Sequence, residues 1–190
     1  QRTEASAAER AAARSWRRRA ARVLYAIADA LPWLIDVLPD RSLRNTVKET
    51  ARYFDNRNGI ARAVREVVKA SLRGPLQAHE PILLIGHSMG SIIAYDALWE
   101  LWHEEGITGR VDLFLTLGSP LGMRFVQRRL LGHEPDGQRT YPGNIRRWVN
   151  VAAEGDLTAL DPILCDDFRP LLALGLTEAI EDYHTGVFTY

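Results

Sequence analysis

The stretch 86–90, with the sequence Gly-His-Ser-Met-Gly, holds the residue in this chain that is best suited to nucleophilic chemistry. The apolar run 81–85 before it predicts a buried strand, and residues 91–99 after it predict a helix. A serine in a tight strand-to-helix turn of this kind presents its hydroxyl to a substrate. We therefore expect Ser88 to be a nucleophile. The alternative is a glycine-bounded turn that carries an ordinary surface serine.

The neighbours of Ser88 would support this chemistry. Gly86 and Gly90 would let the flanking backbones approach a strained turn closely, because glycine has no Cβ. A helix that begins at the serine directs its free N–H groups toward the reaction centre. The backbone N–H of Met89 is therefore the expected donor to a developing oxyanion.

Strand and helix patterns alternate along the chain on both sides of this turn. Apolar runs at 111–117 and 145–152 predict two more strands, and residues 187–190 look like another. The alternation predicts an α/β fold with a mostly parallel sheet flanked by helices, in which ligands bind at the carboxyl ends of the strands. Ser88, residues 118–122 and Asp156 would lie at that edge.

Two segments before the serine predict amphipathic helices. Between Gly59 and Pro75 the charged residues lie away from an apolar face, which consists of Ile60, Val64, Val67, Val68 and Leu72. Residues 11–31 place apolar side chains at helical spacing opposite a face of arginines. We favour packing of this basic helix on the domain with its arginines in solvent. The alternatives are a lid over an apolar pocket and a helix at a membrane interface.

Composition narrows the function classes. The 190 residues fit one domain, and 24 basic residues balance 24 acidic ones, so no overall field favours nucleic acid or an anionic membrane. Cys165 is alone and the five histidines are scattered, so we expect neither an internal disulfide nor a metal site, and no cofactor. With no signal peptide and no apolar stretch of spanning length, we expect a cytoplasmic protein whose contact with a membrane surface is not favoured.

Four segments together resemble the α/β-hydrolase superfamily, and more narrowly its bacterial lipase-like and esterase-like members. They are GHSMG after PILLI, then LFLTLGSPLG, then WVNVAAEGDLTA, and a late histidine. The resemblance covers roughly residues 60–190, and its most specific part is the serine turn. It implies an α/β-hydrolase-like catalytic core at 59–190, and the amphipathic pattern before it predicts a helical lid-like or packing segment at 1–58.

The resemblance also implies a catalytic triad in the chain order serine, acid, histidine. Asp156 follows the predicted strand 145–152 and matches the position of the acid, which would hold the histidine in its working tautomer. Glu154 and Asp161 are close rivals. A loop or helix-capping aspartate is the structural alternative for Asp156.

His184 is the only histidine after Asp156 and keeps the order of the triad. A neutral imidazole can take the serine proton and return it to the leaving group. In the family, however, the histidine usually follows the last core strand, whereas His184 precedes the strand-like residues 187–190. The base is thus either His184 or a histidine beyond Tyr190.

A second departure from the family concerns residues 1–80, which contain neither a set of apolar strands nor a loop for the second oxyanion donor. We expect an internal stretch of a longer hydrolase that lacks the first strands; a naturally minimal hydrolase is the alternative. Without those strands the nucleophile strand would be an unpaired apolar edge, through which an oligomer could form.

Taken together, these features predict a serine hydrolase that cleaves a carboxylic ester or thioester of a small molecule through an acyl-enzyme on Ser88. Acyl transfer to another acceptor would use the same residues. The alternative from a different class is a non-catalytic module of the same fold that binds an acyl ligand or a protein partner.

Overall fold

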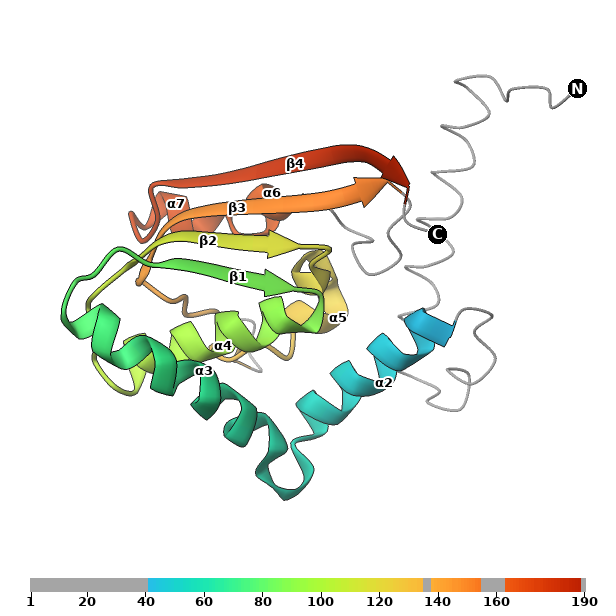
Figure 1. The fold of residues 1–190 in the computed structure, drawn as a ribbon, viewed down its shortest axis with the longest axis horizontal. Helices are drawn as coiled ribbons and strands as arrows, with labels where there is room; N and C mark the ends of the chain where they lie inside the picture. Colours follow the sequence, from blue (N-terminus) through green and yellow to red (C-terminus); the bar gives the residue numbers. More distant parts are fainter. Residues whose placement is uncertain (1–40, 135–137, 155–162, 189–190) are drawn as a thin grey trace, which may run out of the picture.

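A computed structural model describes residues 41–134, 138–154 and 163–188 (Figure 1). The predicted basic helix at 11–31 and Asp156 lie outside these ranges. In chain order the helices and strands are α2 (Arg41–Asp55), η2 (Arg57–Gly59), α3 (Ile60–Gln77), β1 (Leu83–His87), α4 (Met89–His103), β2 (Val111–Leu117), η3 (Pro120–Gly122), α5 (Arg124–Gln127), β3 (Ile145–Glu154), α6 (Leu164–Asp167), α7 (Arg169–Ala173) and β4 (Ala179–Phe188).

Four parallel strands form one sheet in the order β1-β2-β3-β4, and helices flank it (Figure 1). The predicted α/β class with a parallel sheet is therefore confirmed. Since all strands run the same way, β1 and β2 end at the same edge of the sheet, immediately before Ser88 and Gly118. The last strand begins at Ala179 rather than at 187, because a paired strand can form from the mixed polar and apolar residues 179–186.

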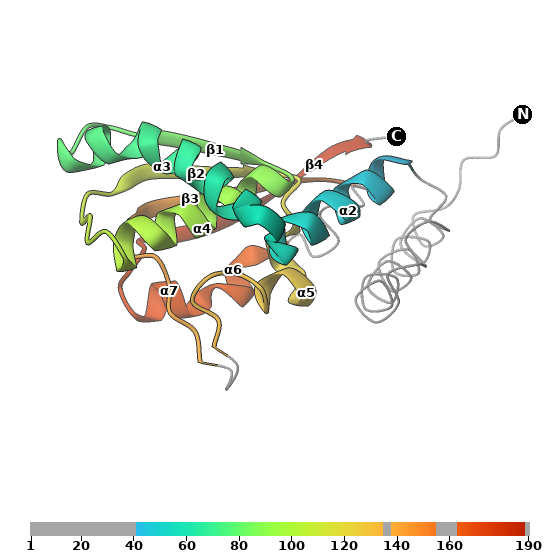
Figure 2. The ribbon, with the colours of Figure 1, turned by 90° about the horizontal axis from the view of Figure 1, so that it is seen from below.

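One face of the sheet carries the hydrophobic core. Trp148 of β3 lies against Phe114 of β2, against Tyr95 of α4 and against Phe168, which separates α6 from α7. All four of these aromatic side chains are buried. Figure 2 shows α4, α6 and α7 on this same side of the sheet.

The opposite face carries mostly apolar side chains beside the Arg147–Glu181 ion pair, and the described helices do not cover it (Figure 2). Leu83 and Ile85 of β1 are 58% and 54% exposed, and Tyr183 of β4 is also exposed. Strands of parallel sheets are usually buried on both faces. In this structure the helices cover only one face of the sheet, although β1 carries apolar residues on both faces.

Helix α3 buries only part of its predicted apolar face: Leu72 is buried and Val68 is half-buried against the core. Ile60, Val64 and Val67 are exposed, Val67 by 70%, whereas Arg65 and Lys69 are buried. An amphipathic helix ordinarily turns its apolar face to the core. Arg65 and Lys69 share the buried side because carboxylates on and just after helix α4 face α3.

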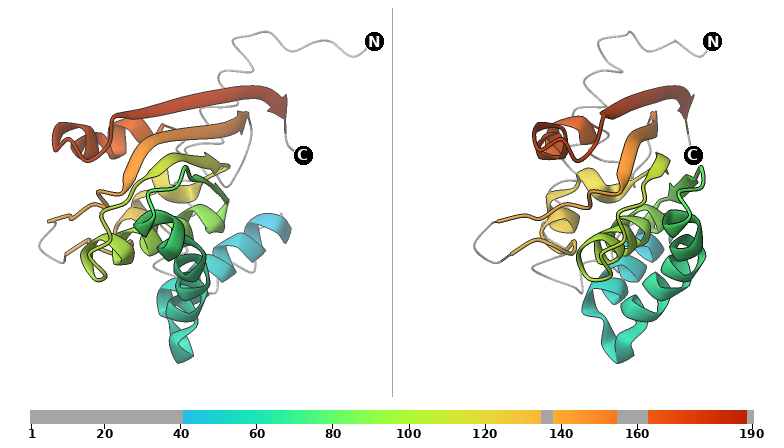
Figure 3. Two further views of the ribbon diagram at one scale, coloured as in Figure 1. Left: turned by 60° about the vertical axis from the view of Figure 1, so that its left-hand side comes forward. Right: turned by 90° about the vertical axis from the view of Figure 1, so that its left-hand side faces the viewer.

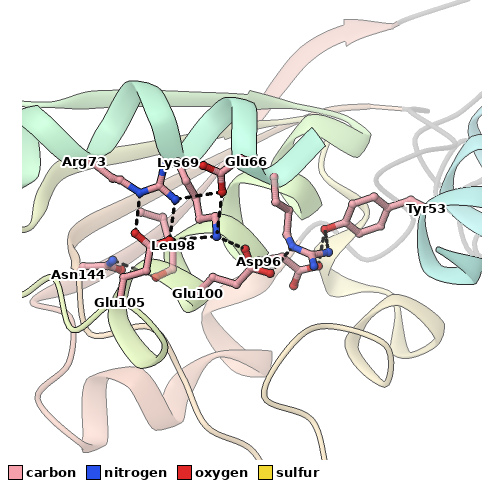
Figure 4. A network of polar contacts seen from close by, with 10 residues as sticks. Tyr53, Glu66, Lys69, Arg73, Asp96, Leu98, Glu100, Glu105 and Asn144 are labelled. Atoms are coloured by element: carbon pink, nitrogen blue, oxygen red, sulfur yellow. Dashed lines mark hydrogen bonds and ion pairs between the residues drawn. The ribbon is translucent and has the colours of Figure 1, made fainter. Parts of the chain in front are cut away.

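A network of ion pairs joins these two helices (Figure 4). Glu100 of α4 is 2.7 Å from Arg65 Nε and 2.8 Å from Lys69 Nζ. Lys69 is also 3.0 Å from Glu105, which Arg73 contacts at 2.6 Å. Buried charges are tolerated when they are paired in this way. The network fixes α3 on α4, the helix that begins immediately after Ser88.

Within the described ranges no helix has the length and apolarity needed to cross a membrane.

Candidate functional site

Ser88 occupies the turn between β1 and α4 with a backbone conformation that L-residues rarely adopt. Its φ is 50° and its ψ is −126°. A non-glycine residue held there stores on the order of 1–3 kcal/mol of strain, and such strain is concentrated at functional sites. The side chain is partly exposed and does not cap its own helix. Ser88 thus combines a strained backbone with a partly exposed residue whose side chain is not used as a helix cap.

The two glycines of the turn have different structural roles. A Cβ on Gly86 would lie 2.7 Å from the Cα of Ser91, so only glycine lets β1 cross the start of α4 at this distance. A Cβ on Gly90 would meet no atom within 4 Å. The expected need for a close approach is thus confirmed at Gly86 and wrong at Gly90, which lies in the open first turn of α4.

The first turn of α4 directs backbone donors toward the space beside Ser88. The N–H of Ser91 donates to the Ser88 carbonyl at 3.0 Å. Met89 is the first helical residue, and an α-helix offers no acceptor to N–H groups at that position. Its N–H remains the predicted oxyanion donor, and the positive end of the helix dipole favours an anion at the same place.

Two buried serines continue from this turn into the loop after β2. The Ser91 hydroxyl donates to the Ser88 carbonyl at 2.6 Å and lies 2.7 Å from the Ser119 hydroxyl. Ser119 Oγ accepts from the backbone N–H of Leu121 at 3.2 Å. Ser119 lies in the segment 118–122 that the sequence placed at this edge, whereas no sequence signal pointed to a role for Ser91.

A second row of polar side chains crosses the sheet one residue before the end of β2. Thr116 accepts from Trp148 Nε1 at 3.0 Å and donates to Asn150 Oδ1 at 2.9 Å. Asn150 Nδ2 then donates to Asp182 Oδ1 at 2.9 Å. The Asp182 carboxylate also accepts from the first two N–H groups of α6, at 3.0 and 2.9 Å. Each of these side chains is engaged in joining strands or in capping a helix.

The predicted base lies at the far side of the sheet from the nucleophile. His184 is a residue of β4, opposite Ala152, and its side chain is exposed. Ser88 follows β1, so three inter-strand spacings of about 4.8 Å, roughly 14 Å in all, separate the two backbones. Figure 3 shows the two strands at opposite ends of the sheet. No hydrogen bond joins these two described residues, and the role of His184 stays a prediction.

The predicted acid, Asp156, and its rival Asp161 lie outside the described residues. Strand β3, which leads toward them, ends at Glu154. The role of Asp156 likewise stays a prediction. Among the residues that the structure describes, no group of three or more His, Cys, Asp or Glu side chains is arranged to hold a metal ion.

One buried carboxylate lies deeper in α4. Asp96 accepts from the Tyr53 hydroxyl of α2 at 2.7 Å and from the N–H of Leu131 at 3.0 Å. Burial raises the pKa of Asp96 to about 6 and also raises the pKa of Tyr53. Asp96 thus connects α4 to α2 and to the segment after α5 (Figure 4).

The fold and this site define a parallel α/β protein with a strained serine at the carboxyl edge of its sheet. Comparisons with protein-family models, curated proteins and solved structures found no match to the chain.

Proposed function

We propose that this protein is a serine hydrolase of the α/β-hydrolase superfamily, similar to bacterial lipases and esterases, which cleaves carboxylic esters or thioesters of small molecules. The observation that carries the proposal is the strained backbone of Ser88. That strain is combined with partial exposure of the residue and the start of a 15-residue helix. A serine that only closed a turn would gain nothing from this conformation, since glycine adopts it without strain.

In the proposed reaction the Ser88 oxygen attacks the carbonyl carbon of the substrate while its proton passes to a general base. The tetrahedral oxyanion accepts a hydrogen bond from the Met89 N–H. The carbonyl re-forms as the alcohol or thiol leaves with that proton. Water then attacks the acyl carbonyl while the base takes its proton and passes it to the Ser88 oxygen. This step releases the acid and restores the Ser88 hydroxyl.

A fluorophosphonate reagent tests the nucleophile directly, because it forms a covalent adduct with activated serines. Intact mass should show one adduct on the wild-type chain and none on Ser88→Ala. Ser71→Ala is the matched control, since Ser71 is exposed on α3 and far in sequence from the turn. Hydrolysis of nitrophenyl esters should fall on the order of 10⁴- to 10⁶-fold in Ser88→Ala. A folded wild-type chain that takes no adduct would refute the proposal.

The same reagent tests the base and the acid separately. His184→Gln and Asp156→Asn should slow labelling if these residues form the triad with Ser88. His79→Gln serves as a control, because His79 is exposed between α3 and β1. Labelling of His184→Gln at the wild-type rate would assign the base to another group and leave the nucleophile in place.

The position of His184 favours a second candidate, a non-catalytic module of the same fold that binds an acyl ligand or a protein partner. A module of this kind would bind a fatty acid or an uncleaved ester without taking a fluorophosphonate adduct. An acyltransferase would take the adduct and pass the acyl group to an added alcohol or thiol rather than to water. A series of nitrophenyl esters of increasing acyl length would report the depth of the acyl pocket.

A further inference from the structure

The carbonyl of Ser88 is held by two donors from a single residue. Ser91 gives it both the backbone N–H, at 3.0 Å, and the side-chain hydroxyl, at 2.6 Å. Ser91 is fully buried, so water does not compete for these bonds. The carbonyl of a strained turn is therefore fixed more tightly than helix geometry alone requires.

The direction of the hydroxyl bonds follows from counting protons. Ser91 has one hydroxyl proton, which goes to the Ser88 carbonyl. In its 2.7 Å contact with Ser119, Ser91 must then accept, so the Ser119 hydroxyl donates. Ser119 in turn accepts from the N–H of Leu121. The result is a one-way chain from Leu121 through Ser119 and Ser91 to the Ser88 carbonyl, and bonds aligned in this way strengthen one another.

This chain acts on the peptide group that contains the predicted oxyanion donor. The Ser88 carbonyl and the Met89 N–H belong to one peptide plane, in which they point in opposite directions. Fixing the carbonyl therefore fixes the direction of the N–H. Hydrogen bonds accepted by the carbonyl also polarise the group and make its N–H a stronger donor.

We propose that Ser91 and Ser119 are positioning residues for the oxyanion hole, whose buried hydroxyls hold the Ser88–Met89 peptide so that the Met89 N–H points at the tetrahedral oxygen. The inference rests on the proposed hydrolase function. Neither hydroxyl touches the substrate; both act through the peptide. The loop after β2, which carries Ser119, is thereby a working part of the site, and its contribution reaches Ser88 through one hydrogen-bonded relay.

Steady-state hydrolysis of a nitrophenyl ester separates this role from a structural one. Ser91→Ala should lower kcat on the order of 10- to 100-fold with little change in KM, because an oxyanion donor is used mainly in the transition state. Ser119→Ala should lower kcat about tenfold, and Ser119→Thr, which keeps the hydroxyl, should restore most of it. The double variant should be no slower than Ser91→Ala, since residues of one relay are not additive.

Controls keep a folding defect from imitating the effect. The final amount of fluorophosphonate adduct counts the competent molecules, and kcat is expressed per competent molecule. Ser71→Ala is again the matched control, because the Ser71 hydroxyl also donates to a backbone carbonyl, that of Val67, but at an exposed position of α3. An unchanged kcat in both Ser91→Ala and Ser119→Ala, with a reactive wild type, would overturn the relay and leave the hydrolase standing. A wild-type chain that takes no adduct would overturn both.

Discussion

The two faces of the sheet differ far more in burial than in sequence. On the face that α4, α6 and α7 cover, Trp148, Phe114 and Ile180 are buried. On the other face, Leu83 and Ile85 are just as apolar and stay largely exposed. In a parallel sheet, strand sequence alone does not say which face the rest of the molecule covers.

This contrast extends to the helices. The covered side holds the buried ion pairs of α3 and α4 and the carboxylate of Asp96, whereas α3 leaves Ile60, Val64 and Val67 in solvent. Polar groups are thus buried where ion-pair or hydrogen-bond partners face them. Apolar groups are exposed where no described element packs against them. Burial in this molecule follows the availability of partners rather than polarity alone.

The largest expected effect comes from a matched pair of isoleucines on the two edge strands. Ile180 of β4 is 7% exposed on the covered face, and Ile85 of β1 is on the open face. Ile180→Ala should lower the free energy of unfolding by about 2–5 kcal/mol, because it removes buried methylene groups and leaves a cavity. Ile85→Ala should cost less than about 1 kcal/mol. Urea unfolding measures both, and equal losses would mean that the open face is covered in solution.

The sequence predicted the elements around Ser88 well because their signals are local. The serine turn, the strand before it and the end of α4 near His103 all follow from apolar runs bounded by glycine and charged residues. The true extent of β4 was missed because its polar residues are stabilised by pairing with β3, which no local pattern encodes.

Errors on the helices and in the site have the same physical origin. The buried face of α3 is set by Glu100, which is 35 positions from Arg65 in the chain. The relay through Ser119 depends on the register that brings the end of β2 beside the end of β1. Residue type and spacing identified the nucleophile, whereas its supporting contacts depend on tertiary structure.

A pH effect of intermediate size is expected from the covered side. Burial raises the pKa of Asp96 to about 6 from an ordinary value of 3.8, so the native state holds this proton more tightly than the unfolded chain. The free energy of unfolding should therefore fall as pH rises from about 4 to 6, on the order of 2–3 kcal/mol from this group, and level off above pH 6. The groups that face Asp96 are Tyr53, Arg65 and Glu100.

Asp96→Asn isolates this effect, because it keeps the shape of the side chain and cannot ionise. The difference in unfolding free energy between wild type and variant should depend on pH between 4 and 6 and be constant above. Glu105 does not produce the same pH dependence. Hydrogen bonds from Arg73 lower its pKa to about 2, so its contribution to the free energy of unfolding is lost only at more acidic pH. A difference that is independent of pH would show that the pKa of Asp96 is the same in the native and unfolded chains.

A charge on the edge strand β1 should have the smallest effect on stability. It is also the sharpest test of the open face. The backbone groups of β1 alternate in direction, so half of them point away from β2, beside the exposed Leu83 and Ile85. Such an edge is a template for pairing with a second copy. Ile85→Lys should change the free energy of unfolding by less than about 1 kcal/mol but shift the chain toward monomer in sedimentation at increasing concentration. Thr108→Lys, at an exposed loop position before β2, is the control, and equal shifts in both variants would assign the change to net charge rather than to the edge.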